Sequence, residues 1–220
     1  EWTYVCDSPT SDIGSYAEFN GLVYIFGYGV KALYTFDGMA VTTQSDELPV
    51  KPNYEYGVAF VLENELYAFL NGSASAHRHL YKLVDGAWTQ LTDLSDITNY
   101  PSYGVAVIGS KAYWLNSSRL LYCYDGNTVT QIPISVTINA NFHRTLSDGK
   151  VGYFVPSGPT APFYKLVDGE VIECKRRLPF DSVWVPTRWV VFNGRIHLCG
   201  GRYNTSGSSN ALIHMSCAMG

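Results

Sequence analysis

The sequence of 220 residues predicts an all-β fold, a β-propeller with five antiparallel blades of four strands each. The main observation is an internal repeat with a period of about 43 residues. Its clearest copies are LYKLVDG at 80–86 and FYKLVDG at 163–169, and weaker copies begin at residues 33, 121 and 212. A second observation is that no segment has a sustained helical period, because Gly, Pro and Asn recur too often.

Each repeat is predicted to be a meander of four short strands. The first strand, as in 58–62, 105–108 and 189–192, leads through an Asn-Gly-like turn into an alternating apolar second strand. A loop of variable length leads to the LYKL strand, and an Asp-Gly turn leads to a short fourth strand such as 87–91. Asn-Gly and Asp-Gly favour tight hairpins because both residues tolerate positive φ.

The two ends of the chain are predicted to complete one blade together. The fifth repeat reaches only its third strand, whereas Glu1-Trp2-Thr3-Tyr4-Val5 resembles the fourth strand Ala87-Trp88-Thr89-Gln90-Leu91. We therefore expect a single domain, 1–220, with blades at 11–50, 51–98, 99–136, 137–180 and 181–220, the last receiving its fourth strand from 1–7. Two packed β-sandwiches are the alternative architecture.

Composition excludes several classes of protein. A net charge of −4 gives no attraction for nucleic acid or for anionic lipid, and no apolar segment is long enough to span a bilayer. Five Cys without a CxxC pair indicate neither a disulfide framework nor a zinc site, and a single bridge stays open. Because the chain starts at Glu1, we expect a processed product or a domain of a longer polypeptide, and its localisation stays unknown.

The repeats resemble those of kelch-type propellers. The resemblance rests on Gly200-Gly201 after an apolar strand, on the Tyr of the LYKL strand and on the Trp of AWTQL. Only the fifth repeat keeps the double Gly, and kelch rings usually have six or seven blades. The repeats are also similar to kelch-like repeats in tail-associated proteins of bacteriophages and prophages, which implies a virion tail or another extracellular particle with several subunits.

Binding is expected on the face that carries the long loops. The loops between second and third strands and the connections between blades meet there, and they are rich in Tyr, Trp, Asn, Ser and Arg. The tyrosines that recur in the second and third strands are expected to pack between blades. The ligand-binding candidates are Tyr28, Tyr54, Tyr100, Tyr103, His143, Trp184, Arg188, Arg202, Tyr203 and Asn204. His143 and Arg144 are expected near the entrance to the central channel.

The sequence predicts no catalytic residues, no metal and no cofactor. Glycosidic cleavage needs two carboxyl groups roughly 5 to 10 Å apart. The candidates Glu18, Glu55 and Asp12 occupy dissimilar positions in their repeats. The cluster His77-Arg78-His79 alternates on an extended segment, which suits a metal poorly.

The sequence therefore favours a non-enzymatic binding module, a phage or prophage tail domain that recognises a cell-surface glycan or protein. An intracellular kelch adaptor that binds one protein partner is the alternative. A glycan-processing enzyme that uses Glu18 and Glu55 is the third hypothesis. Fold-level resemblance does not by itself assign a function.

Overall fold

The strands of the first three blades follow the predicted meander. The computed structural model describes residues 4–10, 13–27, 29–45, 47–50, 58–71, 78–91, 100, 101, 104–138, 142–156, 162–174, 188–192, 195–199 and 214–218. The first blade contains β1 (Ile13–Phe19), β2 (Leu22–Gly27), β3 (Leu33–Phe36) and β4 (Val41–Thr43). The second contains β5 (Val58–Leu62), β6 (Glu65–Asn71), β7 (Arg78–Val84) and β8 (Ala87–Gln90). The third contains β9 (Ala106–Ile108), β10 (Lys111–Leu115), β11 (Leu121–Tyr124) and β12 (Val129–Ile132).

The last two sheets differ in their number of strands. The fourth blade contains β13 (Phe142–Ser147), β14 (Gly152–Pro156), β15 (Tyr164–Val167) and β16 (Glu170–Glu173). The fifth sheet contains β17 (Arg188–Phe192), β18 (Arg195–Cys199) and β19 (His214–Ala218). In every sheet the strands pair in chain order, and all of the pairs are antiparallel.

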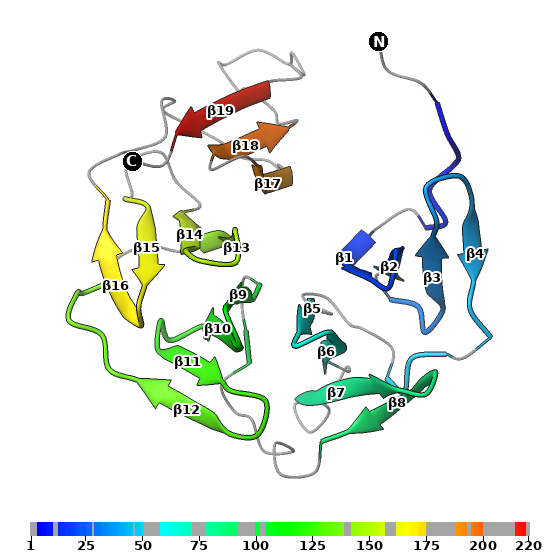
Figure 1. Cartoon of the computed structure of the whole chain (residues 1–220), viewed down its shortest axis with the longest axis horizontal. Helices are drawn as coiled ribbons and strands as arrows, with labels where there is room; N and C mark the ends of the chain where they lie inside the picture. The colour runs from blue at the N-terminus through cyan, green and yellow to red at the C-terminus, as the bar shows by residue number, and fades with distance from the viewer. Residues whose placement is uncertain are drawn as a thin grey trace.

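The sheets are arranged around a common centre, with the first strand of each sheet innermost (Figure 1). β1, β5, β9, β13 and β17 face the centre, and β4, β8, β12 and β16 lie at the periphery. The all-β propeller predicted from the repeats is confirmed, since its blades are four-stranded antiparallel meanders.

The number of complete blades differs from the five that the sequence predicts. The structure has four blades of four strands, not five, and the fifth sheet has three strands within the described part of the chain. Of the predicted closing strand, 1–7, residues 4–7 are described and lie in no strand, with Tyr4 75% and Val5 52% exposed. The segment before β1 lies apart from β19, the outer strand of the fifth sheet (Figure 1). Its sequence resembles the fourth strand of the second blade, but its described residues do not pair with β19.

Hydrophobic clusters join each described pair of consecutive blades. Phe26 and Leu33 of the first blade pack with Leu70 and Tyr81 of the second, and Leu48 completes this cluster. Other clusters join the second blade to the third, the third to the fourth, and the fourth to Ile196 of β18. Because successive side chains of a strand point to opposite faces, each strand supplies two clusters.

β10 shows how one strand serves two interfaces. Ala112 and Trp114 pack toward the second blade, and Tyr113 and Leu115 pack toward the fourth. Trp114 is fully buried and contacts Phe69 edge-to-face at a centroid distance of 5.0 Å. The blades are therefore held together by apolar contacts between sheets.

The tight turns have the geometry that their sequences predict. Asn20-Gly21 has φ values of 51° and 76°, and Asp85-Gly86 has 49° and 85°. Positive φ at both central positions is the type I′ pattern, whose twist matches that of the flanking strands. Short turns of this kind leave no room for a site on their face of the propeller.

Candidate functional site

The described residues enclose one candidate site, a central cavity of about 600 Å³. Its walls come from the innermost strands β1, β5, β9 and β13, with Val191 of β17 at one side. The inner strands run in the same direction around the ring, and a parallel bridge joins Ile108 to Gly149. A cavity of this volume is within the range of small-ligand sites.

Hydrogen bonds between inner strands fix the cavity wall. The hydroxyl oxygen of Ser15 accepts the backbone N–H of Ala59 at 3.0 Å and links β1 to β5. The hydroxyl of Ser147 donates to the carbonyl oxygen of Val107 at 2.5 Å and links β13 to β9. These contacts cross between blades, so the cavity is formed before any ligand enters.

The lining is mainly apolar. On β5, Val58, Phe60 and Val61 contribute to it, and Val105 and Val107 contribute from the third blade. Ligand sites commonly combine apolar walls with a few placed polar groups, so that burial supplies affinity and the polar groups supply orientation. The lining therefore suits the apolar body of a ligand better than a surface covered by hydroxyl groups.

Two ionisable side chains of opposite charge line the cavity at different heights. Glu18 is exposed and lies two residues before the Asn20-Gly21 turn, whereas Arg144 lies four residues before the turn at Asp148. With a rise of about 3.3 Å per residue, the two positions differ by roughly 7 Å along the strand direction. Arg144 therefore lies in the half of the cavity nearer the long loops, and Glu18 lies in the half nearer the tight turns.

Thr145, next to Arg144 on β13, has a buried hydroxyl without a partner. The residue is 8% exposed, it lines the cavity, and its Oγ1 makes no hydrogen bond. Gly104 approaches its backbone so closely that a Cβ at position 104 would lie 3.3 Å from the Thr145 carbonyl oxygen. Buried polar groups are nearly always hydrogen-bonded, so this hydroxyl requires an explanation.

The ten residues predicted for binding have different outcomes. Tyr100 is buried, its hydroxyl donates to the carbonyl oxygen of Phe69 at 3.0 Å, and its ring packs edge-to-face on Phe69. The structure therefore places Tyr100 in the core between the second and third blades, and not on an open surface. Arg188 begins β17 and His143 lies in β13, but their side chains are outside the described part. The other residues lie outside the described ranges: Tyr28, Tyr54, Tyr103, Trp184, Arg202, Tyr203 and Asn204.

Most of the recurring tyrosines pack between blades, as the sequence predicts, whereas Tyr24 and Tyr34 are partly exposed. Tyr67, Tyr113 and Tyr153 of the second strands are buried, as are Tyr122 and Tyr164 of the third strands. Burial raises the pKa of Tyr113 to about 12. The Tyr113 phenol therefore stays neutral throughout the physiological pH range, and these buried rings serve packing.

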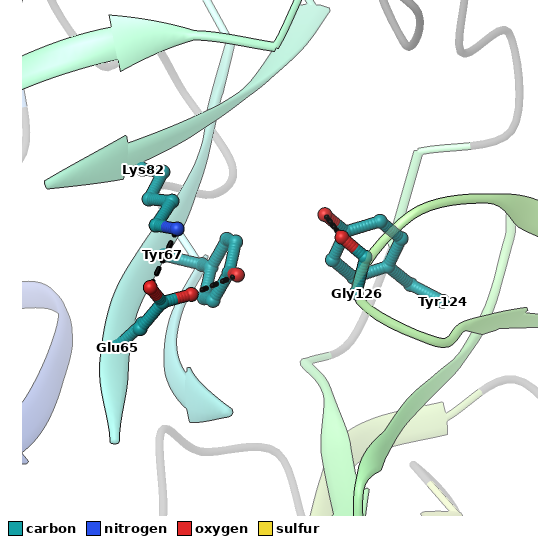
Figure 2. Close-up of polar contacts among 5 residues, drawn as sticks. All are labelled: Glu65, Tyr67, Lys82, Tyr124 and Gly126. Atoms are coloured by element: carbon teal, nitrogen blue, oxygen red, sulfur yellow. Dashed lines mark hydrogen bonds and ion pairs between the residues drawn. The ribbon is translucent and has the colours of Figure 1, made fainter. Parts of the chain in front are cut away.

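A polar cluster on the tight-turn side is structural (Figure 2). The Glu65 carboxylate accepts from the Lys82 ammonium at 2.6 Å and from the Tyr67 hydroxyl at 2.7 Å. The hydrogen bond from Lys82 is the main cause that lowers the pKa of Glu65, and burial is the main cause that raises the pKa of Tyr67. The Tyr124 hydroxyl donates to the carbonyl oxygen of Gly126 at 2.6 Å, and its ring meets Tyr67 edge-to-face. The cluster seals one end of the interface between two blades.

No pair of carboxylates is found among the described lining residues. Glu18 is the one acid there, and Asp12 and Glu55 lie outside the described ranges. Within the described residues no group of three His, Cys, Asp or Glu could hold a metal ion. Within the described part of the chain, Cys6, Cys123 and Cys174 form no disulfide bond. No helix in the described part is long and apolar enough to cross a membrane.

Comparisons with known proteins show the fold. No family model matches the chain, and no curated protein matches it. Among solved structures, YjhT has a TM-score of 0.68 and 15% identity over 90% of this chain and 75% of that one. A virginiamycin B lyase from Staphylococcus aureus in complex with quinupristin has a TM-score of 0.53 and 13% identity over 94% and 70%. YCF48 bound to D1 peptide has a TM-score of 0.52 and 14% identity over 87% and 66%.

These neighbours support the propeller fold and no more specific family or function. Their identities lie at 13–15%, a level at which a shared fold hosts different activities. One is an enzyme and another is bound to a peptide, so the comparison does not decide between catalysis and binding. None of the three is described as a kelch-repeat protein or a phage-tail protein.

Proposed function

We propose that this propeller is a non-catalytic binding module that takes part of its partner into the central cavity. The observation that carries the proposal is the cavity itself, about 600 Å³, with apolar walls and few polar groups. The hydroxyls of Ser15 and Ser147 tie the inner strands together, so that little ordering is needed on binding.

The chemistry of the lining favours a protein partner over a glycan for this cavity. A sugar presents many hydroxyls, which need polar partners once they are buried. The β5 wall offers Val58, Phe60 and Val61 instead. The ligand candidates on the long loops, Trp184, Tyr203 and the others outside the described ranges, remain proposed contacts for a cell-surface glycan or protein around the mouth of the cavity.

The finer assignment rests on the resemblance of the repeats. Their similarity to kelch-like repeats of phage and prophage tail proteins supports a proposed role in recognising a host surface. An intracellular adaptor would use the same cavity and the same loop face. Binding to whole cells favours the first role, and capture of one cytosolic protein favours the second.

A cavity-filling variant tests the proposal. The intact chain is screened against a glycan array, whole cells and an immobilised peptide library, together with Val61→Trp, which places an indole in the cavity. Met39→Trp is the matched control, because Met39 is 78% exposed in a tight turn. Binding that is lost in Val61→Trp and kept in Met39→Trp supports the proposal. Binding that both variants retain, or the absence of any binding, would overturn it.

A further inference from the structure

The outer edge of the fifth sheet has no fourth strand in the described part of the chain. In the other four sheets, the third strand pairs with a fourth strand at the periphery. The fifth sheet has the order β17-β18-β19, so β19 is its outer strand (Figure 1). The backbone N–H and C=O groups along such an edge are a template for a strand of another chain. β19 is therefore a place where a further strand can be added.

The segment 4–7 has the properties of a strand without a sheet. It lies in no strand, and Tyr4 is 75% and Val5 is 52% exposed. In sequence, residues 1–5 resemble residues 87–91, which contain β8, the fourth strand of the second blade. Pairing with a sheet would remove the apolar surface of these two side chains from water.

The second blade provides the register for such a pairing. β6 and β18 are equivalent, because each begins directly after the two-residue turn that follows the innermost strand. The third residue of β6, Tyr67, pairs with Lys82 of β7. The third residue of β18, His197, pairs with Ser216 of β19. Lys82 and Ser216 are therefore equivalent positions on the two third strands.

This equivalence predicts which residues would lie opposite each other. In the second blade, Gln90 pairs with Tyr81, the residue before Lys82. Tyr4 corresponds to Gln90 in the sequence comparison, and Met215 is the residue before Ser216. A fourth strand made of the N-terminal segment would thus place Tyr4 opposite Met215.

The next pair would be joined by a backbone hydrogen bond. In the second blade, the N–H of Leu91 donates to the carbonyl oxygen of Leu80 at 3.1 Å. Val5 corresponds to Leu91, and His214 corresponds to Leu80. The N–H of Val5 would therefore donate to the carbonyl oxygen of His214.

The strand would have to come from another molecule, because the segment before β1 lies apart from β19 of the same chain (Figure 1). We propose that β19 binds the N-terminal segment of a second copy of this chain as its fourth strand. A reciprocal exchange gives a closed dimer. The exchanged strand is short, so association is expected to be weak, with the monomer dominant at low concentration. This inference concerns assembly and is independent of the binding role proposed for the cavity.

Disulfide cross-linking between two different chains tests the pairing. One chain carries Tyr4→Cys, and the other carries Met215→Cys and an affinity tag. The two positions would form a non-hydrogen-bonded pair, because they adjoin the pair that is bonded through Val5. Cα atoms in such a pair are about 4.5 Å apart, which a disulfide can bridge. Mild oxidation of the mixture should give a linked dimer of one tagged and one untagged chain on a nonreducing gel.

Matched controls account for the native cysteines and for the register. Each single variant is oxidised alone, and Tyr4→Cys is also mixed with Ser216→Cys, which is one residue out of register. Cross-linking no greater than in these controls would overturn the proposal. A chain that carries both Tyr4→Cys and Met215→Cys and forms only an internal disulfide would also overturn it, because the segment would then close its own sheet.

Sedimentation of the intact chain, from low micromolar to nearly millimolar concentration, tests the contact without added cysteines. Val5→Pro removes the backbone N–H and is expected to weaken association at least about 10-fold, since each copy donates one strand. Val5→Thr keeps the N–H and the β-branched shape, so its association should stay within about 3-fold of the wild type. A monomer at every concentration, or association that Val5→Pro leaves unchanged, would refute the exchange.

Discussion

The hydroxyl of Thr145 leads to a prediction about stability with an unusual sign. Thr145 is 8% exposed, and Thr145→Val replaces its buried hydroxyl, which makes no hydrogen bond, with a methyl group of similar size. Removal of a buried unsatisfied hydroxyl recovers part of its desolvation cost of about 1–3 kcal/mol. Because the residue borders a cavity, we take the lower end and expect a gain of about 1 kcal/mol. For a chain of this length, that gain corresponds to a Tm about 2–4 °C higher.

Thr35 provides the matched control. It is 4% exposed, it also lies in a strand, and its hydroxyl oxygen accepts a hydrogen bond from Nε2 of Gln44 at 2.6 Å. Thr35→Val removes that acceptor and leaves the amide without this partner, so we expect a loss of about 1 kcal/mol. The same chemical change should therefore shift stability in opposite directions at the two positions.

Urea unfolding followed by tryptophan fluorescence measures both variants. The slope with denaturant should be unchanged, which shows that only stability differs. Thr145→Ser is a further control, since it keeps the hydroxyl and should not be stabilised. If Thr145→Val is destabilised as much as Thr35→Val, the Thr145 hydroxyl has a partner in the free protein.

Three other predictions concern the backbone, the ion pair and the N-terminal segment. Gly104 has a φ of +110°, and a Cβ added there would lie 3.3 Å from the Thr145 carbonyl oxygen, so Gly104→Ala should cost about 1–3 kcal/mol in thermal unfolding. It should cost more than Gly149→Ala, where an added Cβ would meet no atom within 4 Å. The pKa of Glu65 is lowered from 4.5, so its ion pair stabilises the fold above that pH and loses its effect as pH falls below it. Glu65→Gln should thus cost less than about 1 kcal/mol at pH 7, since the carboxylate is 43% exposed, and the difference from wild type should vanish in acid titrations of stability. Val5→Pro should change Tm by less than about 2 °C, since Val5 is 52% exposed and outside any strand; a fall of many degrees would restore the closing strand predicted from 1–7.

The blades were predictable because their determinants are local. Asp85-Gly86 and Asp168-Gly169 form turns of nearly identical φ, and the alternation of each flanking strand fixes which side chains face a neighbouring blade. Most of the recurring tyrosines were placed correctly between blades for the same reason, because one repeat predicts the environment of the next.

The closing strand was wrongly predicted because a segment that resembles a fourth strand in sequence does not necessarily pair with the edge of a sheet. Trp88 owes its role to the register of β7 and β8 and to an edge-to-face contact with Phe26 at 5.8 Å. Residues 4–7 of the similar pattern near the N-terminus lie in no strand, and Trp2 lies outside the described residues. Tyr100 was misjudged for a related reason: it lies in a connection between blades, and nothing in its local sequence shows that Phe69 supplies an acceptor.

The polar groups of the cavity were only partly predictable. Arg144 was expected near the channel entrance together with His143, and it lines the cavity. Whether the Thr145 hydroxyl has a hydrogen-bond partner depends on the third blade. Gly104 packs against the Thr145 backbone, and no group of that blade bonds the hydroxyl. A relation between residues about forty positions apart leaves no local pattern to detect.

The hydroxyl groups of the cavity wall have different effects on stability. Ser15 and Ser147 use their hydroxyls to hold neighbouring inner strands together, which makes the wall rigid. The Thr145 hydroxyl is buried and makes no hydrogen bond, so its desolvation lowers the stability of the protein. Thr145→Val should therefore be more stable than the wild type, whereas the two serine hydroxyls are needed for the contacts between inner strands.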